Sequence, residues 1–136
     1  MSKHFEIILF TASQRCYADA VVGVLDPARE LIQHRFYRED CLCINGVHFK
    51  DLRVIGNRNL HEMLIVDNAP YTFAYQLDHG IPIVSWKDDP YDRELFDLTQ
   101  YLKSLATAAD MVQVNAETFK LRSYYADCHA AYFGAV

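Results

Sequence analysis

The order of apolar and polar positions along the chain predicts strands that alternate with helices. Residues 5–10 and 62–66 form nearly unbroken apolar runs, which is typical of strands buried on both faces of a sheet. Between them, residues 17–25 carry apolar side chains at helical spacing, and Asp26-Pro27 ends that pattern. Residues 95–105 show the same helical spacing. The alternation predicts an α/β fold with a mostly parallel sheet and helices on both faces.

Turn and breaker residues predict the shorter elements. Asn45-Gly46 is a strong hairpin signal and lies between two short β-rich runs. Pro82 cannot donate a ladder hydrogen bond, so its strand is expected near a sheet edge. Asp88-Asp89-Pro90 predicts the start of the second helix. The remaining expectations are a strand at 34–38, hairpin strands at 41–44 and 47–49, a turn at 70–75, an edge strand at 81–84, a helical tail at 116–136 and a docking segment at 132–136.

Composition narrows the classes of protein that fit. The chain has 136 residues, of which 51% are hydrophobic and 23% charged, as expected for one globular domain over residues 1–136. Its formal net charge of −5 argues against a nucleic-acid partner, because binding to phosphate backbones needs clustered Lys and Arg. No apolar run approaches the roughly 20 residues of a membrane span. Four cysteines without a disulfide pattern lead us to expect reduced thiols and an intracellular protein without a membrane partner.

Small polar residues follow the two main predicted strands. Thr11 comes directly after one, and Asp67-Asn68 after the other, at the strand ends where ligands collect in parallel sheets. Asp67 could bind a hard cation such as Mg²⁺, or it could cap the turn before Pro70; spacing alone leaves both open. Thr11 has the same two interpretations. Lys50 and Arg38 flank the predicted hairpin and could hold a phosphoryl group, although most such residues are simply solvated.

The order of several motifs is more specific than any one of them. Together they resemble the small CTD phosphatases, a group of NLI-interacting-factor-like enzymes in the haloacid dehalogenase superfamily. The resemblance covers about residues 5–110. The motifs are Phe10-Thr11-Ala12-Ser13, Tyr17-Ala18-Asp19, Leu25-Asp26, Tyr37-Arg38-Glu39-Asp40-Cys41, Lys50-Asp51-Leu52, Ile65-Val66-Asp67-Asn68-Ala69-Pro70, Ile81-Pro82-Ile83 and Ser85-Trp86.

The resemblance implies a haloacid-dehalogenase-like (Rossmannoid) fold and gives each candidate residue a role. Thr11 corresponds to the hydroxyl that hydrogen-bonds the transferring phosphoryl group, and Lys50 to the ammonium that neutralises its charge. Asp67 corresponds to a Mg²⁺ ligand, with Asn68 beside it completing the metal environment. Arg38 and Tyr17 fall where the family lines its phosphopeptide groove. This set suits phosphoryl transfer, which depends on positioning and charge neutralisation.

One departure from the family is large. Its first motif, D-x-D-x-T, carries the Asp nucleophile that forms an aspartyl-phosphate and the Asp general acid/base, and this chain contains no Asp-x-Asp pair. In the family the corresponding strand lies between the strands that end here at Thr11 and Asp67. We therefore expect a domain truncated of its first central strand: a fragment, a rearranged sheet, or an edge filled by another chain through oligomerisation or strand exchange. Direct pairing of the two strands would contradict this expectation.

The resemblance implies a Mg²⁺-dependent phosphatase acting on phosphoserine or phosphothreonine in proteins. The repeated carboxy-terminal tail of RNA polymerase II is the family's typical substrate, and nuclear residence is inherited from the family in the same way, with the cytoplasm as the other option. Because the nucleophile motif is absent, we expect these 136 residues to be inactive alone. The alternative is a catalytically dead module of the same fold that binds a peptide or a partner.

Overall fold

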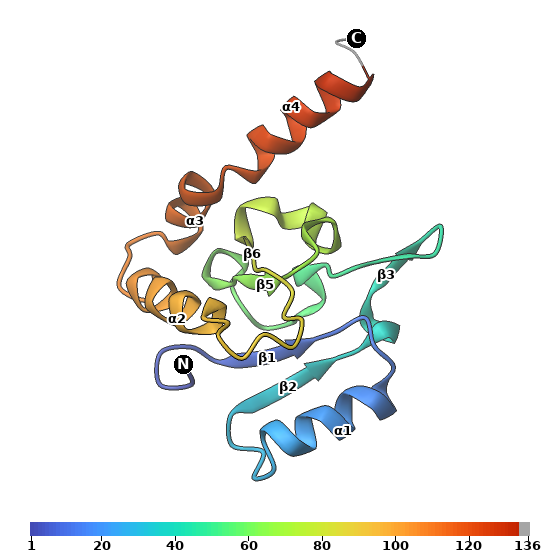
Figure 1. Ribbon diagram of the computed structural model, residues 1–136, viewed down its shortest axis with the longest axis vertical. Coiled ribbons are helices and arrows are strands. Elements are labelled where there is room, and N and C mark those ends of the chain that lie inside the picture. Colours follow the sequence, from blue (N-terminus) through green and yellow to red (C-terminus); the bar gives the residue numbers. More distant parts are fainter. Residues whose placement is uncertain (134–136) are drawn as a thin grey trace.

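A computed structural model describes residues 1–133, with side chains as far as Asp127 (Figure 1). The strands are β1 (Ile7–Phe10), β2 (Ile32–Phe36), β3 (Leu42–Ile44), β4 (Val47–Phe49), β5 (Ile65–Asp67) and β6 (Gly80–Pro82). The α-helices are α1 (Arg15–Leu25), α2 (Glu94–Leu105), α3 (Met111–Phe119) and α4 (Leu121–Phe133). Short 3₁₀ segments are η1 (Arg38–Asp40), η2 (Leu52–Val54), η3 (Leu60–Glu62) and η4 (Pro70–His79).

The described strands form three separate pairs. β1 pairs with β2 and β5 pairs with β6, both in parallel, while β3 and β4 form an antiparallel hairpin. The parallel pairs and the helices between strands confirm the predicted α/β class. Among the described strands β6 pairs with β5 alone, as Pro82 predicts. Within residues 1–133, β1 and β5 are not paired with each other, although Figure 1 shows them in adjacent halves of the molecule.

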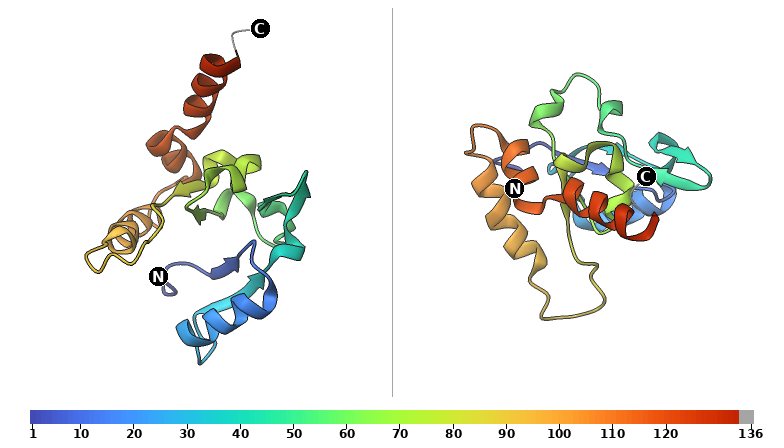
Figure 2. Two further views of the ribbon diagram at one scale, coloured as in Figure 1. Left: turned by 45° about the vertical axis from the view of Figure 1, so that its right-hand side comes forward. Right: turned by 90° about the horizontal axis from the view of Figure 1, so that it is seen from above.

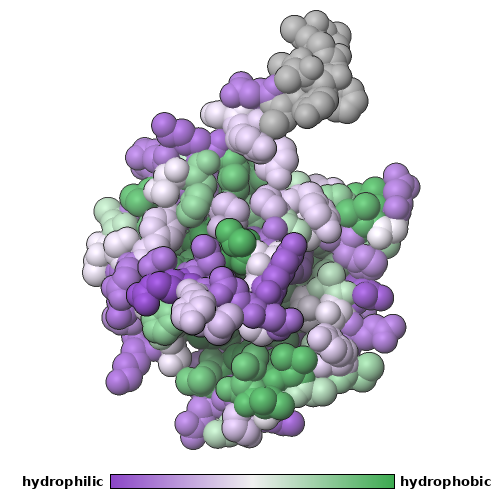
Figure 3. Space-filling view, in the orientation of Figure 1, coloured by the Kyte–Doolittle hydropathy of each residue, from purple (hydrophilic) through white to green (hydrophobic). Residues whose placement is uncertain are grey.

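Helix α1 links β1 to β2 and packs through Ala18 and Val22, both buried. The Asp26 carboxylate ends the helix by accepting the backbone N–H groups of residues 30–32, which turns the chain into β2. These bonds hold the pKa of Asp26 below its ordinary value. The apolar stripe from which the helix was predicted faces solvent instead, and Figure 3 shows hydrophobic surface over α1 at the lower end of the molecule. Its members are Tyr17, Val21, Val24 and Leu25.

The hairpin forms as its turn residues predict. Asn45 and Gly46 have φ values of 50° and 81°, the left-handed conformation that both central residues of a type I′ turn require. The turn therefore sets the register, with Ile44 opposite Val47 and Leu42 opposite Phe49.

The hydrophobic core gathers around Phe73, which has no exposed surface and lies with Leu52 and Ile65. Gly80 makes this position possible. A Cβ atom built on Gly80 would lie 2.0 Å from a ring carbon of Phe73, so any larger residue collides with the ring. The first residue of β6 is thus fitted to the aromatic centre of the core.

The expected burial of the two main strands on both faces is not met. All four residues of β1 are only half-buried, and Val66 in β5 is 38% exposed between buried Ile65 and Asp67. Within the described residues each of these strands has one hydrogen-bonded neighbour, so its apolar side chains lack the flanking side chains of a second neighbouring strand.

The second helix begins later than Asp88-Asp89-Pro90 predicts. Asp88 has φ of 55°, which a right-handed helix cannot accommodate, and helix α2 starts only at Glu94. The side chain of Asp89 accepts the N–H of Tyr91. Asp88 and Asp89 thus stabilise a loop. At the start of the helix, it is the carboxylate of Asp92 that accepts a backbone N–H, from Glu94.

A buried amide helps to attach the C-terminal helices to the rest of the chain. Asn115 in α3 is fully buried; its side-chain nitrogen donates to the carbonyls of Asp78 and Gly80, and its oxygen accepts the Tyr101 hydroxyl. Lys120, at φ of 50°, ends α3 before α4 begins, and Figure 2 shows α4 projecting away from the rest of the chain. The predicted docking segment 132–136 lies outside the residues whose side chains the structure describes. None of the described helices combines the length and apolar character needed to cross a membrane.

Gly80→Ala should lower the free energy of unfolding by about 3 kcal/mol or more, because the core must move to admit the methyl group. Gly23→Ala is the matched control: Gly23 is exposed in α1, and a Cβ there meets nothing within 4 Å. It should stabilise the protein by about 0.5–1 kcal/mol. Urea denaturation measures both, and equal effects of the two variants would contradict the assigned fit between Gly80 and Phe73.

Candidate functional site

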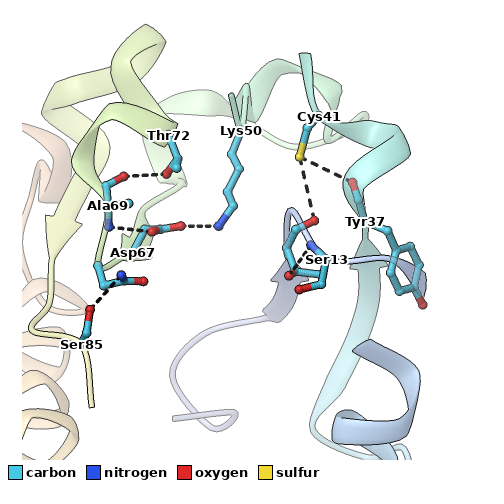
Figure 4. Close-up of polar contacts among 10 residues, drawn as sticks. Ser13, Tyr37, Cys41, Lys50, Asp67, Ala69, Thr72 and Ser85 are labelled. Atoms are coloured by element: carbon cyan, nitrogen blue, oxygen red, sulfur yellow. Dashed lines mark hydrogen bonds and ion pairs between the residues drawn. The ribbon is translucent and has the colours of Figure 1, made fainter. Parts of the chain in front are cut away.

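Asp67 lies at the end of β5 with its carboxylate buried, and both oxygens have partners (Figure 4). Oδ1 accepts the backbone N–H of Ala69 at 2.8 Å, and Oδ2 accepts the ammonium of Lys50. Asp67 therefore does cap the turn before Pro70, which was one of its two interpretations. The other interpretation, metal binding, stays a prediction, because the second carboxylate oxygen accepts the Lys50 ammonium here.

Lys50 follows β4, and both its backbone and its side chain make hydrogen bonds. Its backbone N–H donates to the Thr72 carbonyl at 2.6 Å, and its side chain extends to Asp67 (Figure 4). Both charged side chains are about nine-tenths buried, with exposed fractions of 11% for Lys50 and 7% for Asp67. A buried ammonium can donate three hydrogen bonds, so this contact leaves donor capacity for an incoming anion.

Asp51 fixes the chain immediately after Lys50. Its carboxylate accepts the backbone N–H and guanidinium of Arg53 and the side-chain amide of Gln76, and Gln76 in turn accepts the N–H of Leu52. The Arg53 side-chain hydrogen bonds are the main reason that the pKa of Asp51 is lowered to about 2. The position of Lys50 thus depends on an ionised neighbour.

Thr11 comes directly after β1, and its hydroxyl oxygen accepts the N–H of Ser13 at 3.1 Å. In the described part of the chain this bond uses the oxygen as acceptor, so the hydroxyl hydrogen is available to donate. Arg38 braces the same loop: its guanidinium donates to the Ala12 carbonyl at 2.7 Å and its backbone N–H to the Ser13 carbonyl at 3.1 Å. Figure 4 shows Ser13 at the same edge of the structure as Asp67 and Lys50.

The structure does not bring every candidate residue into one cluster. Asn68 follows Asp67, and its amide donates to the Ser85 hydroxyl at 2.9 Å. Tyr17 lies on α1 with 66% of its surface exposed and shares no hydrogen bond with the other candidates in the described residues. Ser85 and Thr72 position Asn68 and Lys50. Ser85 belongs to one of the motifs named above, but its contact with Asn68 and that of the Thr72 carbonyl with Lys50 are tertiary, so no local pattern predicts these supporting roles.

Cys41 lies beside Ser13 (Figure 4). Its Sγ lies 3.6 Å from the Tyr37 carbonyl and 3.9 Å from the Thr11 carbonyl. Burial raises the pKa of this thiol, which keeps it protonated at neutral pH and makes it a poor nucleophile.

The donor atoms at the end of β5 suit a hard cation. Asp67 supplies a carboxylate and Asn68 an amide oxygen, and Mg²⁺ is held in proteins by one or two carboxylates, water and substrate phosphate. Over the residues that the structure describes, no group of three or more His, Cys, Asp or Glu side chains is arranged to hold a metal. The chain therefore fits Mg²⁺ as a partial ligand set.

The Lys50–Asp67 pair should appear as strong coupling in a double-mutant cycle. Lys50→Met leaves a buried carboxylate unpaired and should cost about 3–5 kcal/mol of unfolding free energy. Adding Asp67→Asn should recover most of this loss, because the unpaired charge is then gone. Urea denaturation of the four proteins measures the coupling, with exposed Lys87→Met as the control. If the losses of unfolding free energy in the two single variants add up in the double variant, the pair is not formed.

Asp51→Asn tests the anchor next to Lys50 through pH. The folded pKa of about 2 lies below the ordinary 3.8, so ionised Asp51 stabilises the folded state above pH 4, by about 2 kcal/mol. That advantage over the Asn variant should fall as pH drops from 4 toward 2. Denaturation at pH 7, 5 and 3 measures it, with exposed Glu30→Gln as the control for charge removal. A difference that is constant over this pH range would contradict the assignment.

The sequence and the fold were compared with known proteins. Residues 1–113 match the profile of the family described as NLI interacting factor-like phosphatase. The chain is 43% identical over 125 residues to CTD small phosphatase-like protein 3 of Caenorhabditis elegans, covering 91% of this chain and 43% of that protein. It is 42% identical over 121 residues to CTD small phosphatase-like protein 2 of Dictyostelium discoideum, covering 89% of this chain and 21% of that protein.

The chain thus spans less than half the length of these relatives. Among solved structures, Fcp1, described as an essential RNA polymerase II CTD phosphatase, aligns with a TM-score of 0.53 at 12% identity, over 97% of this chain and 47% of the Fcp1 chain. At that identity the alignment shows the fold alone, which is haloacid-dehalogenase-like. By its match to the family profile over residues 1–113, the chain belongs to the NLI interacting factor-like phosphatase family.

Proposed function

We propose that this chain is the phosphate- and metal-handling part of a Mg²⁺-dependent protein phosphatase. Its substrate would be phosphoserine or phosphothreonine in proteins, of the kind found in the carboxy-terminal tail of RNA polymerase II. The observation that carries the proposal is the buried Lys50 ammonium on the Asp67 carboxylate, at the edge where Figure 4 also shows Ser13. A family relationship and this charge pair together favour phosphoryl chemistry over other uses of the fold.

Lys50 would neutralise the charge of the transferring phosphoryl group. Its side chain is about nine-tenths buried, and electrostatic attraction to an anion is stronger where water is excluded. The backbone bond to Thr72 and the Asp51 anchor hold the ammonium in place before substrate arrives.

Thr11 would donate its hydroxyl hydrogen to a phosphoryl oxygen, because the Ser13 N–H already fixes the orientation of the oxygen. Arg38 is exposed beside the same loop and would bind the phosphopeptide, as a guanidinium fork matches phosphate oxygens. Tyr17 would contact the peptide at a greater distance. Asp67 and Asn68 would hold Mg²⁺, which when bound lowers the charge on the phosphoryl oxygens.

The two buried carboxylates next to Lys50 are not free to act as the nucleophile in the described geometry. Asp67 is engaged by Lys50 and Ala69, and Asp51 by Arg53 and Gln76. We therefore propose that the carboxylate which forms the aspartyl-phosphate comes from residues outside these 136, and that this chain alone does not hydrolyse a phosphoester.

From its family, we propose that the protein works in the nucleus. A second candidate function, a binding module without catalysis, follows from the same lack of a nucleophile.

Binding of a phosphopeptide tests the proposal without requiring turnover. We expect the chain to bind a fluorescent phosphoserine peptide copied from the RNA polymerase II tail about tenfold more tightly than its unphosphorylated form, and only with Mg²⁺. Lys50→Gln and Thr11→Val should each remove most of this preference, and Asp67→Asn its Mg²⁺ dependence. Exposed Lys87→Gln is the control, and circular dichroism checks that each variant folds.

Two outcomes would contradict parts of the proposal. Equal binding of both peptides would remove the phosphate-handling role and favour the partner-binding module. Hydrolysis of p-nitrophenyl phosphate by this chain, lost in Asp67→Asn, would contradict the claim that the nucleophile lies outside it.

A further inference from the structure

A buried tyrosine ties the segment after β2 to α1. Tyr37 follows β2 with only 3% of its surface exposed, and its hydroxyl donates to the Asp19 carboxylate at 2.7 Å. Burial, together with the contact to Asp19, raises the pKa of this hydroxyl, so it stays protonated and can donate at neutral pH. Arg35 donates to the same oxygen of Asp19 at 2.9 Å. These contacts fix the position of the Tyr37 ring.

Arg15 lies over this ring at the start of α1. Its guanidinium carbon is 4.0 Å from the centroid of the Tyr37 ring, a distance at which the ring attracts the cation. Stacking on a fixed ring limits the orientations of the planar guanidinium. Even so, 59% of the Arg15 side chain is exposed. Arg15 thus presents a pre-oriented guanidinium to solvent.

Glu39 shows what kind of group this guanidinium binds. Its carboxylate oxygen Oε1 accepts the Nε–H of Arg15 at 3.1 Å and an N–H of a terminal NH₂ group at 2.9 Å. The Glu39 side chain is 51% exposed, and ion pairs between exposed side chains are weak. Another anion can therefore take the place of Glu39, whose carboxylate then returns to water.

Arg15 lies next to the residues proposed to bind the phosphopeptide. The carbonyl of Ser13, two residues before Arg15, accepts the backbone N–H of Arg38 at 3.1 Å. Figure 4 shows Ser13 between Lys50 and the Tyr37 ring. A peptide with its phosphate at Lys50 that extends over the Ser13 loop would therefore come to Arg38 and Arg15.

An acidic peptide needs local positive charge to bind this protein. The formal net charge of −5 repels anionic peptides in general. Arg15 and Arg38 place two guanidinium groups near the same loop, and Glu39 offsets the charge of Arg15 as long as their pair is formed. An anion that displaces Glu39 gains the attraction of the Arg15 charge.

We propose that Arg15 is a specificity-determining residue, which binds a second anionic side chain of the peptide near the phosphorylated residue. The proposal rests on the proposed phosphatase function and adds to it a preference for acidic peptide sequences. The anionic group is a carboxylate or a second phosphate, because a guanidinium fork matches the oxygens of both. Glu39 occupies Arg15 until the peptide arrives and competes with the peptide for it.

Peptides that differ in one side chain measure this preference. Each carries one phosphoserine and, at successive positions on either side of it, a glutamate, a glutamine or a second phosphoserine. At the best position we expect the glutamate peptide to bind about threefold more tightly than the glutamine peptide, as measured by fluorescence anisotropy with Mg²⁺. Tighter binding of the second phosphoserine than of glutamate would identify phosphate as the preferred group, and the reverse order would identify a carboxylate.

Two variants separate Arg15 from its surroundings. Arg15→Gln should abolish the difference between the glutamate and glutamine peptides, while the preference for phosphorylated over unphosphorylated peptide remains. Glu39→Gln should raise the affinity for the glutamate peptide about threefold, because Arg15 is then unoccupied. Adding Arg15→Gln to Glu39→Gln should remove that gain. Exposed Lys87→Gln is the control, and circular dichroism checks that each variant folds.

NMR observes Arg15 directly and does not require recognition of phosphate. The Nε–H signal of Arg15 should shift when an unphosphorylated glutamate peptide is added, and the matched glutamine peptide should leave it unchanged.

Three results would overturn the proposal. Equal affinity for the glutamate and glutamine peptides at every position would show that Arg15 adds no preference. A gain in Glu39→Gln that persists after Arg15→Gln would assign the preference to net charge. Binding of no peptide at all would overturn this proposal together with the proposed function.

Failure of the proposed function alone gives a different result. Phosphorylated and unphosphorylated peptides would then bind equally, with the preference for glutamate intact. That outcome would contradict the phosphate-handling role and support the role of Arg15.

Discussion

The buried ion pair between Lys50 and Asp67 is the interaction on which this site depends, because neither charge is stable there without the other. It ties the end of the hairpin to the end of β5, across 17 residues of sequence. A cation that bound Asp67 alone would leave the buried Lys50 ammonium without a counter-charge. An anion that bound Lys50 alone would leave the Asp67 carboxylate without one. A cation and an anion that arrive together replace both partners at once. If Asp67 binds a cation and Lys50 an anion, as proposed above, the pair would favour joint binding over binding of either ion alone.

Local signals explain most of what could be predicted about the fold. The Asn45-Gly46 turn and the end of α1 at Asp26 depend on conformations and hydrogen bonds within a few residues, and both are found as predicted. The predicted start of α2 is wrong because Asp88-Asp89-Pro90 suits a loop as well as the start of a helix. Helix α1 packs against the rest of the chain through Ala18 and Val22. Such small side chains add little to the hydrophobic periodicity from which a buried face is predicted.

The candidate site shows a different division. Thr11, Lys50 and Asp67 were identifiable from their places after strands and from the family motifs, and the structure supplies their hydrogen bonds. Their roles in binding phosphate and metal stay predictions. The contact of Lys50 with Asp67 is a tertiary fact that no local pattern contains. Tyr17 lies apart from the others, since its place on α1 is set by the packing of Ala18 and Val22 on the opposite side.

Asn115 has a consequence for where this structural unit ends. The family profile stops at residue 113, yet the amide two residues later satisfies two carbonyls at the entry to β6 and the hydroxyl of Tyr101. A protein cut at the profile boundary would leave these polar groups without their partner, next to the ring of Phe73 that Gly80 accommodates. The boundary of the sequence family and the boundary of the cooperative folding unit are therefore different, and expression limits for relatives are better chosen beyond the end of α3 at Phe119.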